Sequence, residues 1–165
     1  MELVLACHRQ QDIQHLFQEY TAVISRQDAE VGACLVAQHY EEELSCLEKK
    51  YGEPYGRLYL ALDHGLPVGC GGLARNDAQF CEMKRLYVKP EYRGQHIGRC
   101  LAQRLIADAR QIGYLHIRLD TFPFMRSAIR LYESLGFRYI DRYNDNPAST
   151  AVFMQLDLSP AVPSP

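Results

Sequence analysis

The chain has 165 residues, of which 47% are apolar and 23% charged, with a formal net charge of −2 and no tryptophan. This length is enough for one domain with a buried core, and the composition is that of an ordinary soluble globular protein. The charge balance argues against nucleic-acid binding, and no apolar run approaches the roughly 20 residues that a membrane helix needs.

The cysteines and histidines indicate a reducing compartment and no metal. None of the six cysteines forms a C-x-x-C pair, and most lie within apolar runs. Such cysteines are typical of reduced, buried thiols. The six histidines show no metal-ligand spacing. With no apolar stretch of a secretory signal at the N-terminus, we expect a cytoplasmic protein.

The first third of the chain predicts a strand and two helices. Residues 2–6 form the strand, and residues 11–24 place apolar side chains at helical spacing. The second helix covers residues 40–51, with acidic residues early and lysines late, an order that suits the helix dipole. Gly52 follows as its stop signal.

The rest of the chain alternates strands and helices. Strands are predicted over residues 57–62, 67–74, 80–88, 116–120, 137–143 and 150–158, and helices over residues 98–112 and 125–135. This order predicts a mixed α/β (α+β) fold, with a central, mostly antiparallel sheet flanked by helices and at least one strand–helix–strand crossover. We expect residues 1–158 to form a single domain and the proline-rich residues 159–165 to form a flexible tail.

Residues 84–99 are the most informative segment. A strand that ends at Pro90 leads into a turn rich in glycine and basic residues, and a long helix follows. Free backbone N–H groups and the positive end of the helix dipole meet at such a turn, a geometry that binds phosphate. Arg93 and Arg99 can add charge-assisted contacts. A purely structural turn is the alternative, because the spacing matches neither a dinucleotide fingerprint nor a Walker loop.

Residues 92–99, Tyr-Arg-Gly-Gln-His-Ile-Gly-Arg, resemble the acetyl-coenzyme A (acetyl-CoA) pyrophosphate loop of the GNAT superfamily of N-acetyltransferases, whose pattern is Arg/Gln-x-x-Gly-x-Gly/Ala. Arg93 and Gly98 match its first and last positions, and His96 stands where the middle glycine usually lies. Residues 128–137 are similar to the family's second cofactor motif, with Met125 in place of an upstream asparagine. The resemblance implies a GNAT-like fold.

The resemblance also implies an acetyl-CoA-dependent N-acetyltransferase that acts by direct attack of a primary amine. The acceptor is then a small-molecule or protein amine, and members of this family often form homodimers. The implied cofactor-binding residues are Leu86, Tyr87, Val88, Arg93, Gly94, Gln95, His96, Ile97, Gly98 and Arg99. The alternative is a non-catalytic acyl-CoA-binding sensor or regulatory module. The differences from the family pattern at His96 and Met125 are compatible with this alternative.

Two side chains are candidates for catalysis. The helical spacing alone predicts that Tyr132 is a core tyrosine of an amphipathic helix. The resemblance instead implies that Tyr132 is a general acid that protonates the leaving thiolate. Strand alternation predicts one shared face for Phe80, Glu82, Lys84, Leu86 and Val88. Glu82 is either half of a surface pair with Lys84 or, as the resemblance implies, the general base.

The acidic run Glu41-Glu42-Glu43 is most simply a solvated helix face. The resemblance places this region at the acceptor pocket, where one of the three carboxylates could attract a cationic amine. We expect the choice of acceptor to depend on the first helices and on the loop at residues 143–147.

Overall fold

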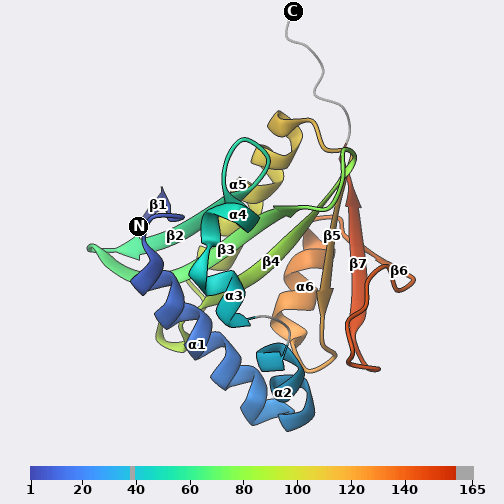
Figure 1. Cartoon of the computed structure of the whole chain (residues 1–165), viewed down its shortest axis with the longest axis horizontal. Helices are drawn as coiled ribbons and strands as arrows, with labels where there is room; N and C mark the ends of the chain where they lie inside the picture. Colours follow the sequence, from blue (N-terminus) through green and yellow to red (C-terminus); the bar gives the residue numbers. More distant parts are fainter. Residues whose placement is uncertain (38–39, 159–165) are drawn as a thin grey trace, which may run out of the picture.

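The computed structural model describes residues 1–37 and 40–158, and places a seven-stranded sheet between two groups of helices (Figure 1). The strand order is β1-β2-β3-β4-β5-β7-β6. The strands are β1 (Glu2–Leu5), β2 (Arg57–Asp63), β3 (Leu66–Arg75), β4 (Phe80–Val88), β5 (His116–Thr121), β6 (Arg138–Ile140) and β7 (Val152–Asp157). Neighbouring strands are antiparallel except β4 and β5, which are parallel and connected through α5 (Ile97–Ile112). The predicted fold class, including its crossover, is confirmed.

Helices cover both faces of the sheet. On one face lie α1 (Gln10–Gln27), α3 (Tyr40–Ser45) and α4 (Leu47–Tyr51), whose buried side chains include Phe17 and Tyr51. On the other face, α5 and α6 (Arg126–Ser134) contribute Leu101, Leu105 and Tyr132 to a second core. Each such side chain contributes about 1.5–3 kcal/mol by burial, so the two cores fix the helices on the sheet.

The N-terminal helices differ from the sequence prediction in two ways. The helix predicted over residues 40–51 is divided at Cys46 into α3 and α4, and α2 (Ala29–Ala37) was not predicted. Asp28 begins α2, since its Oδ1 accepts the N–H groups of Glu30 and Val31 at 3.0 and 3.1 Å.

The C-terminal part is close to the prediction. β6 is shorter than the strand predicted over residues 137–143, and β7 lies within the strand predicted over residues 150–158. The predicted tail, residues 159–165, lies outside the described residues. Within the described part, no helix is long and apolar enough to cross a bilayer.

A β-bulge interrupts β4. The ladder between β3 and β4 shifts register between Cys70 and Gly72, so that Arg85 and Leu86 both oppose Gly71. Arg85 has φ 56°, a left-handed conformation that is unusual for a residue other than glycine. This extra residue bends the strand next to the centre of the sheet.

The bulge reverses the direction of the side chains that follow it. Leu86 and Val88 pack against the core under α5, whereas Glu82 and Lys84 border a cavity on the opposite face, beside α3 and α4. The prediction of one face for all four residues is therefore wrong. Simple alternation fails because the bulge adds one residue to β4.

β4 and β5 pair only where they begin. Phe80–Glu82 pairs with His116–Arg118, and no pairing joins the later residues of these two strands in the described part of the chain. The two strands therefore separate in the middle of the sheet, next to the bulge. This separation positions the candidate site.

Candidate active site

The loop between β4 and α5 turns through two left-handed residues. Gly94 has φ 82° and His96 has φ 61°, and both lie between the short 3-10 helix η1 (Pro90–Tyr92) and α5. Glycine adopts such angles without a steric penalty. This explains why the family pattern places glycine at the position of His96, which takes the same conformation here with a side chain.

Backbone donors accumulate in this loop. Arg93 N–H donates to Pro90 O at 3.2 Å, and Cys100 N–H donates to His96 O at 3.0 Å. Between them, the N–H groups of residues 94–99 form no hydrogen bond with any residue that the structure describes. Residues 94–96 are exposed, and the positive end of the α5 dipole lies at the same place. The loop can therefore bind a phosphate group, as the sequence predicts.

The two arginines of the loop are anchored to its neighbours. Arg93 Nε donates to Val88 O at 3.2 Å, and Arg99 Nη2 donates to Ser134 Oγ on α6 at 2.8 Å. Arg93 comes directly before the unbonded amides in the sequence, and Arg99 is the last residue of that segment. Gly98 is next to Val88 and Leu131, and a Cβ added there would be in ordinary contact with both.

The residues predicted from the end of β4 do not form one surface. Leu86 and Val88 face α5, but the side chain of Tyr87 points to the opposite face. Its ring lies 5.8 Å from that of Tyr20, and its hydroxyl donates to Glu19 Oε2 at 3.3 Å. Tyr87 can therefore contribute only its backbone on the α5 side.

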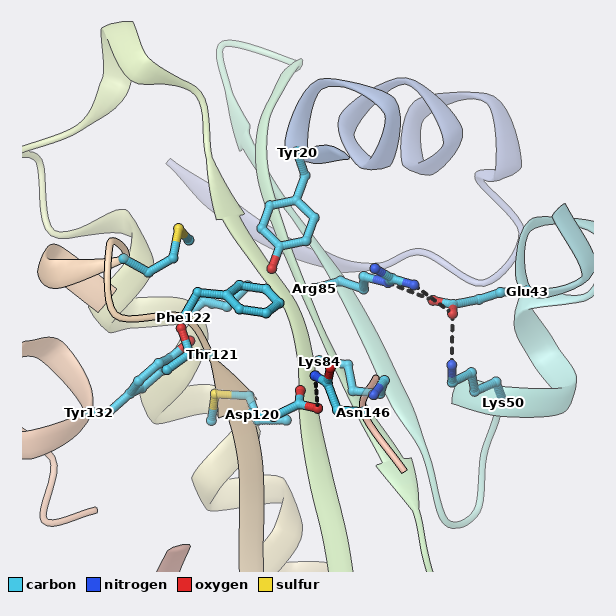
Figure 2. A pocket seen from close by; sticks show the side chains of 13 residues that line it. Tyr20, Glu43, Lys50, Lys84, Arg85, Asp120, Thr121, Phe122, Tyr132 and Asn146 are labelled. Atoms are coloured by element: carbon cyan, nitrogen blue, oxygen red, sulfur yellow. Dashed lines mark hydrogen bonds and ion pairs between the residues drawn. The ribbon is translucent and has the colours of Figure 1, made fainter. Parts of the chain in front are cut away.

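A cavity of about 100 Å³ opens where β4 and β5 separate. We call it the inner cavity. Its walls come from residues 83–86 of β4, residues 120–122 at the end of β5, and the side chains of Tyr20, Tyr132 and Asn146. Figure 2 shows Tyr20 and Tyr132 entering it from opposite sides. Helices from both faces of the sheet thus meet at one small cavity.

Tyr132 has a polar group in this cavity and a ring in the core. It is 6% exposed, and its ring lies 5.7 Å from that of Phe137. Its hydroxyl forms no hydrogen bond with the described residues, and burial, followed by the nearby Tyr20 and Asp120, raises its pKa well above the usual value. The phenol is therefore protonated at neutral pH and can donate a proton.

Glu82 lies in a second cavity, of about 650 Å³, between α3–α4 and residues 74–76. We call this the outer cavity. Glu82 Oε1 accepts hydrogen bonds from Lys84 Nζ and Tyr143 Oη, each at 3.0 Å. Glu82 and Tyr132 therefore border different cavities, and the sequence did not show that Glu82 has two partners.

Glu43, from the acidic run, is buried in a network of cations. Its Oε1 accepts from Tyr51 Oη at 2.6 Å and Arg85 Nε at 3.0 Å, and its Oε2 accepts from Lys50 Nζ at 2.7 Å and Arg85 Nη2 at 3.0 Å. Although burial opposes ionisation, Arg85 and Lys50 lower the pKa of Glu43 to about 2. Glu43 thus holds the bulge and α4 together and is not a solvated residue.

Sequence reasoning missed Asp120. It is the penultimate residue of β5 and lies in the wall of the inner cavity, and its Oδ2 accepts from the Nδ2 groups of Asn144 and Asn146 at 3.0 and 2.9 Å. Its Oδ1 forms no hydrogen bond with the residues that the structure describes. The available signal was an acidic residue near the end of a strand, because its asparagine partners are 24 and 26 residues away in the sequence.

Metal ligands do not gather anywhere in the described chain, where no group of three or more His, Cys, Asp or Glu side chains could hold an ion. The arrangement consists instead of a loop with unbonded amides, a small cavity with a buried phenol and a carboxylate, and a larger charged cavity beside it. Glu43, Lys50 and Lys84 border both cavities, so the two adjoin.

Comparison with known proteins identifies the family. The model of the acetyltransferase (GNAT) family matches residues 12–137. An uncharacterized N-acetyltransferase of Schizosaccharomyces pombe is 37% identical over 150 residues, which cover 90% of this chain and 88% of the relative. The chain therefore belongs to the acetyltransferase (GNAT) family, and the predicted class of enzyme, an acyltransferase, is confirmed.

Solved structures agree with this assignment. An acetyltransferase from Streptococcus agalactiae superposes with a TM-score of 0.75 at 22% identity, covering 95% of this chain and 98% of that one. A Salmonella typhimurium protein described as a putative acetyltransferase, with its cofactor acetyl-CoA, is 25% identical with a TM-score of 0.55, covering 67% of this chain and 68% of that one. The first comparison confirms the fold, and the second gives a similar protein whose structure holds acetyl-CoA.

Proposed function

We propose that residues 1–158 form one N-acetyltransferase domain that transfers the acetyl group of acetyl-CoA to a primary amine by direct attack. The observation that carries this proposal is the arrangement of the separated strands. The unbonded amides of residues 94–99 follow the end of β4, and the inner cavity with Tyr132 lies where β4 leaves β5.

The loop suits the diphosphate of coenzyme A. Residues 94–96 are exposed, the amides of residues 94–99 have no internal acceptor in the described chain, and α5 adds the positive end of its dipole. Arg93, Gly94, Gln95, His96, Ile97, Gly98 and Arg99 would hold the diphosphate. Leu86 and Val88 would border the pantetheine arm, with Tyr87 contributing its backbone.

The amine must lose a proton before or during attack. A lysine-like amine has a pKa near 10.4, so about one molecule in 2,500 is neutral at pH 7, a deficit of about 4–5 kcal/mol. A general base contributes about 10²–10⁴-fold, which is the required scale. Asp120 is the candidate that the geometry favours, because it borders the same cavity as Tyr132 and has one oxygen unused by described residues.

Glu82, the base expected from sequence, takes second place. Its carboxylate borders the outer cavity and accepts from Lys84 and Tyr143. It would have to relay the proton from an amine in the inner cavity through water.

The transfer then balances as follows. The amine nitrogen forms a bond with the thioester carbonyl carbon, and Asp120 takes a proton from nitrogen. A backbone N–H near Leu86–Val88, beside the bulge, would stabilise the oxyanion, an interaction that typically contributes about 2.7–4 kcal/mol. The carbon–sulfur bond breaks, and Tyr132 donates its proton to the thiolate. Cys81 and Cys100 take no part, since no covalent enzyme intermediate is needed.

An acceptor screen tests this function. The full chain is incubated with labelled acetyl-CoA and a panel of small amines and peptides, and both transfer and coenzyme binding are measured. We expect transfer to at least one amine, and its loss in Tyr132→Phe with binding retained. Binding without transfer to any amine would instead support the alternative, an acyl-CoA sensor.

A further inference from the structure

Two lysines mark the junction of the inner and outer cavities. Lys50 from α4 and Lys84 from β4 border both cavities, with side chains that are 36% and 22% exposed. Burial lowers the pKa of Lys50; Glu43 opposes this shift, while the charges of Lys84 and Arg85 add to it. Two lysine side chains thus border the inner cavity where it adjoins the outer one.

The carboxylates at this junction are already engaged. Both oxygens of Glu43 accept from Arg85, one of them also from Lys50, and Glu82 accepts from Lys84. Among the residues that border the two cavities, the cations exceed the carboxylates by one: Lys49, Lys50, Arg75, Lys84 and Arg85 against Glu42, Glu43, Glu82 and Asp120. Within the described chain each lysine has one acceptor, which leaves further N–H donors on each ammonium group.

The opposite charge lies deeper in the inner cavity. Asp120 is held by two neutral amides and forms no ion pair with the described residues. In the view of Figure 2, Tyr132, Asp120 and Lys50 follow one another across the cavity. A negative site beside the catalytic phenol is therefore followed by a positive site toward the outer cavity.

We propose that the acceptor is an amino acid, or a small amine of similar design, whose carboxylate binds the Lys50–Lys84 pair while its amine faces Asp120. This inference rests on the proposed acetyltransfer. The alternative of a polyamine or lysine side chain requires a second ammonium group near the excess positive charge. Glu43 cannot attract such a group, because its two oxygens already accept four donors. The other carboxylates of the outer cavity, Glu42 and Glu82, share it with four cations, Lys49, Lys50, Arg75 and Lys84.

Matched acceptors test the proposal on the native chain. We would compare glycine, leucine, methionine and phenylalanine with their amides and with the amines that lack the carboxyl group, and follow thiol release. We expect kcat/KM for at least one amino acid to exceed that of its amide by about 10–100-fold, as for loss of a charge-assisted hydrogen bond. The comparison is stringent, because the amine of the amide is less basic and more often neutral.

Lysine variants show where the carboxylate binds. Lys50→Met and Lys84→Met should each reduce the ratio of kcat/KM for the amino acid to kcat/KM for its amide toward one. A general effect of disturbing Glu43 or Glu82 lowers both values and therefore cancels in this ratio. Lys89→Met is the matched control, since Lys89 pairs with Glu19 at 3.2 Å and borders neither cavity.

Each outcome decides between the two proposals. Equal or faster acetylation of amides by the native chain, or an unchanged ratio in both lysine variants, would overturn the carboxylate site and leave the acetyltransferase intact. Failure of every acceptor in this panel, with acetyl-CoA bound, would overturn this inference, whereas the proposed function falls only if the wider screen of amines and peptides also gives no transfer.

Discussion

Arg85 and Glu43 join the bulge of β4 to the helices that cover it. The guanidinium donates to both carboxylate oxygens, each at 3.0 Å, and the two side chains are only 8% and 4% exposed. Arg85 adopts a left-handed backbone angle that costs about 1–2 kcal/mol outside glycine. The ion pair fixes this residue, and the bulge in turn directs Leu86 away from the face of Lys84.

The Glu43 carboxylate should make stability depend on acid pH. Its pKa in the folded chain, about 2, lies below the ordinary value of 4.5, so ionisation stabilises the folded state. This contribution, about 3 kcal/mol, is present above pH 4.5 and is lost as the pH falls toward 2. Urea unfolding of Glu43→Gln should therefore show a weaker loss of stability between pH 4.5 and 2 than the native chain.

The exposed Glu41 on the same helix provides the control. Glu41→Gln removes a carboxylate without touching the Arg85 network. Arg85→Met, which leaves the buried carboxylate without its main partner, should cost about 3–5 kcal/mol at pH 7. Equal acid sensitivity in the Glu43→Gln and Glu41→Gln variants would contradict the role of Glu43.

The hydroxyl of Tyr132 should matter for turnover and not for coenzyme binding. Tyr132→Phe keeps the buried ring against Phe137 and removes only the hydroxyl, which has no partner among the described residues. We expect kcat to fall by about 10²-fold or more, with the Kd for CoA nearly unchanged. Tyr139→Phe, which removes an exposed hydroxyl bonded to Glu133, is the control. Unchanged kcat in Tyr132→Phe would exclude the acid role.

The two candidate bases can be separated by isosteric amides. Asp120→Asn should lower kcat/KM by about 10²–10⁴-fold at pH 7. The loss should shrink as pH rises, because more of the amine is then neutral without help. Glu82→Gln keeps acceptors for Lys84 and Tyr143 and should cost less than about tenfold. If the larger loss appears in Glu82→Gln, the general base is Glu82.

The sequence predicted the architecture and the loop because their signals are local. Apolar spacing placed α1, α5 and α6, and the glycine and arginine pattern of residues 93–98 located the unbonded amides. α2 was missed although Asp28 is an N-cap residue. A nine-residue helix has few turns, so the periodic spacing of its apolar residues is hard to recognise in the sequence.

The site was harder to predict because tertiary contacts determine it. Nothing in the sequence of β4 marks Arg85 as the bulged residue, and strand alternation therefore gave the wrong face for Leu86 and Val88. Among three adjacent glutamates, only the position of Arg85 selects Glu43. Asp120 borders the inner cavity because β5 separates from β4 after three residue pairs. This separation depends on the packing of the whole sheet and has no local signal in the sequence.

Gly98 gives a direct test of the anion-binding loop. A Cβ at this position would lie 3.6 Å from Val88 Cγ2 and 3.7 Å from Leu131 Cδ2, so Gly98→Ala should fold, with up to about 1 kcal/mol of added helix stability. Gly98→Trp must project its ring past these neighbours and cover the unbonded amides. Calorimetry with CoA should show at least about 100-fold weaker binding for the tryptophan variant, about 2.7 kcal/mol, with the circular dichroism spectrum unchanged. Native affinity in Gly98→Trp would mean that the coenzyme does not bind at residues 94–99, because the added indole leaves no room for a diphosphate against those amides.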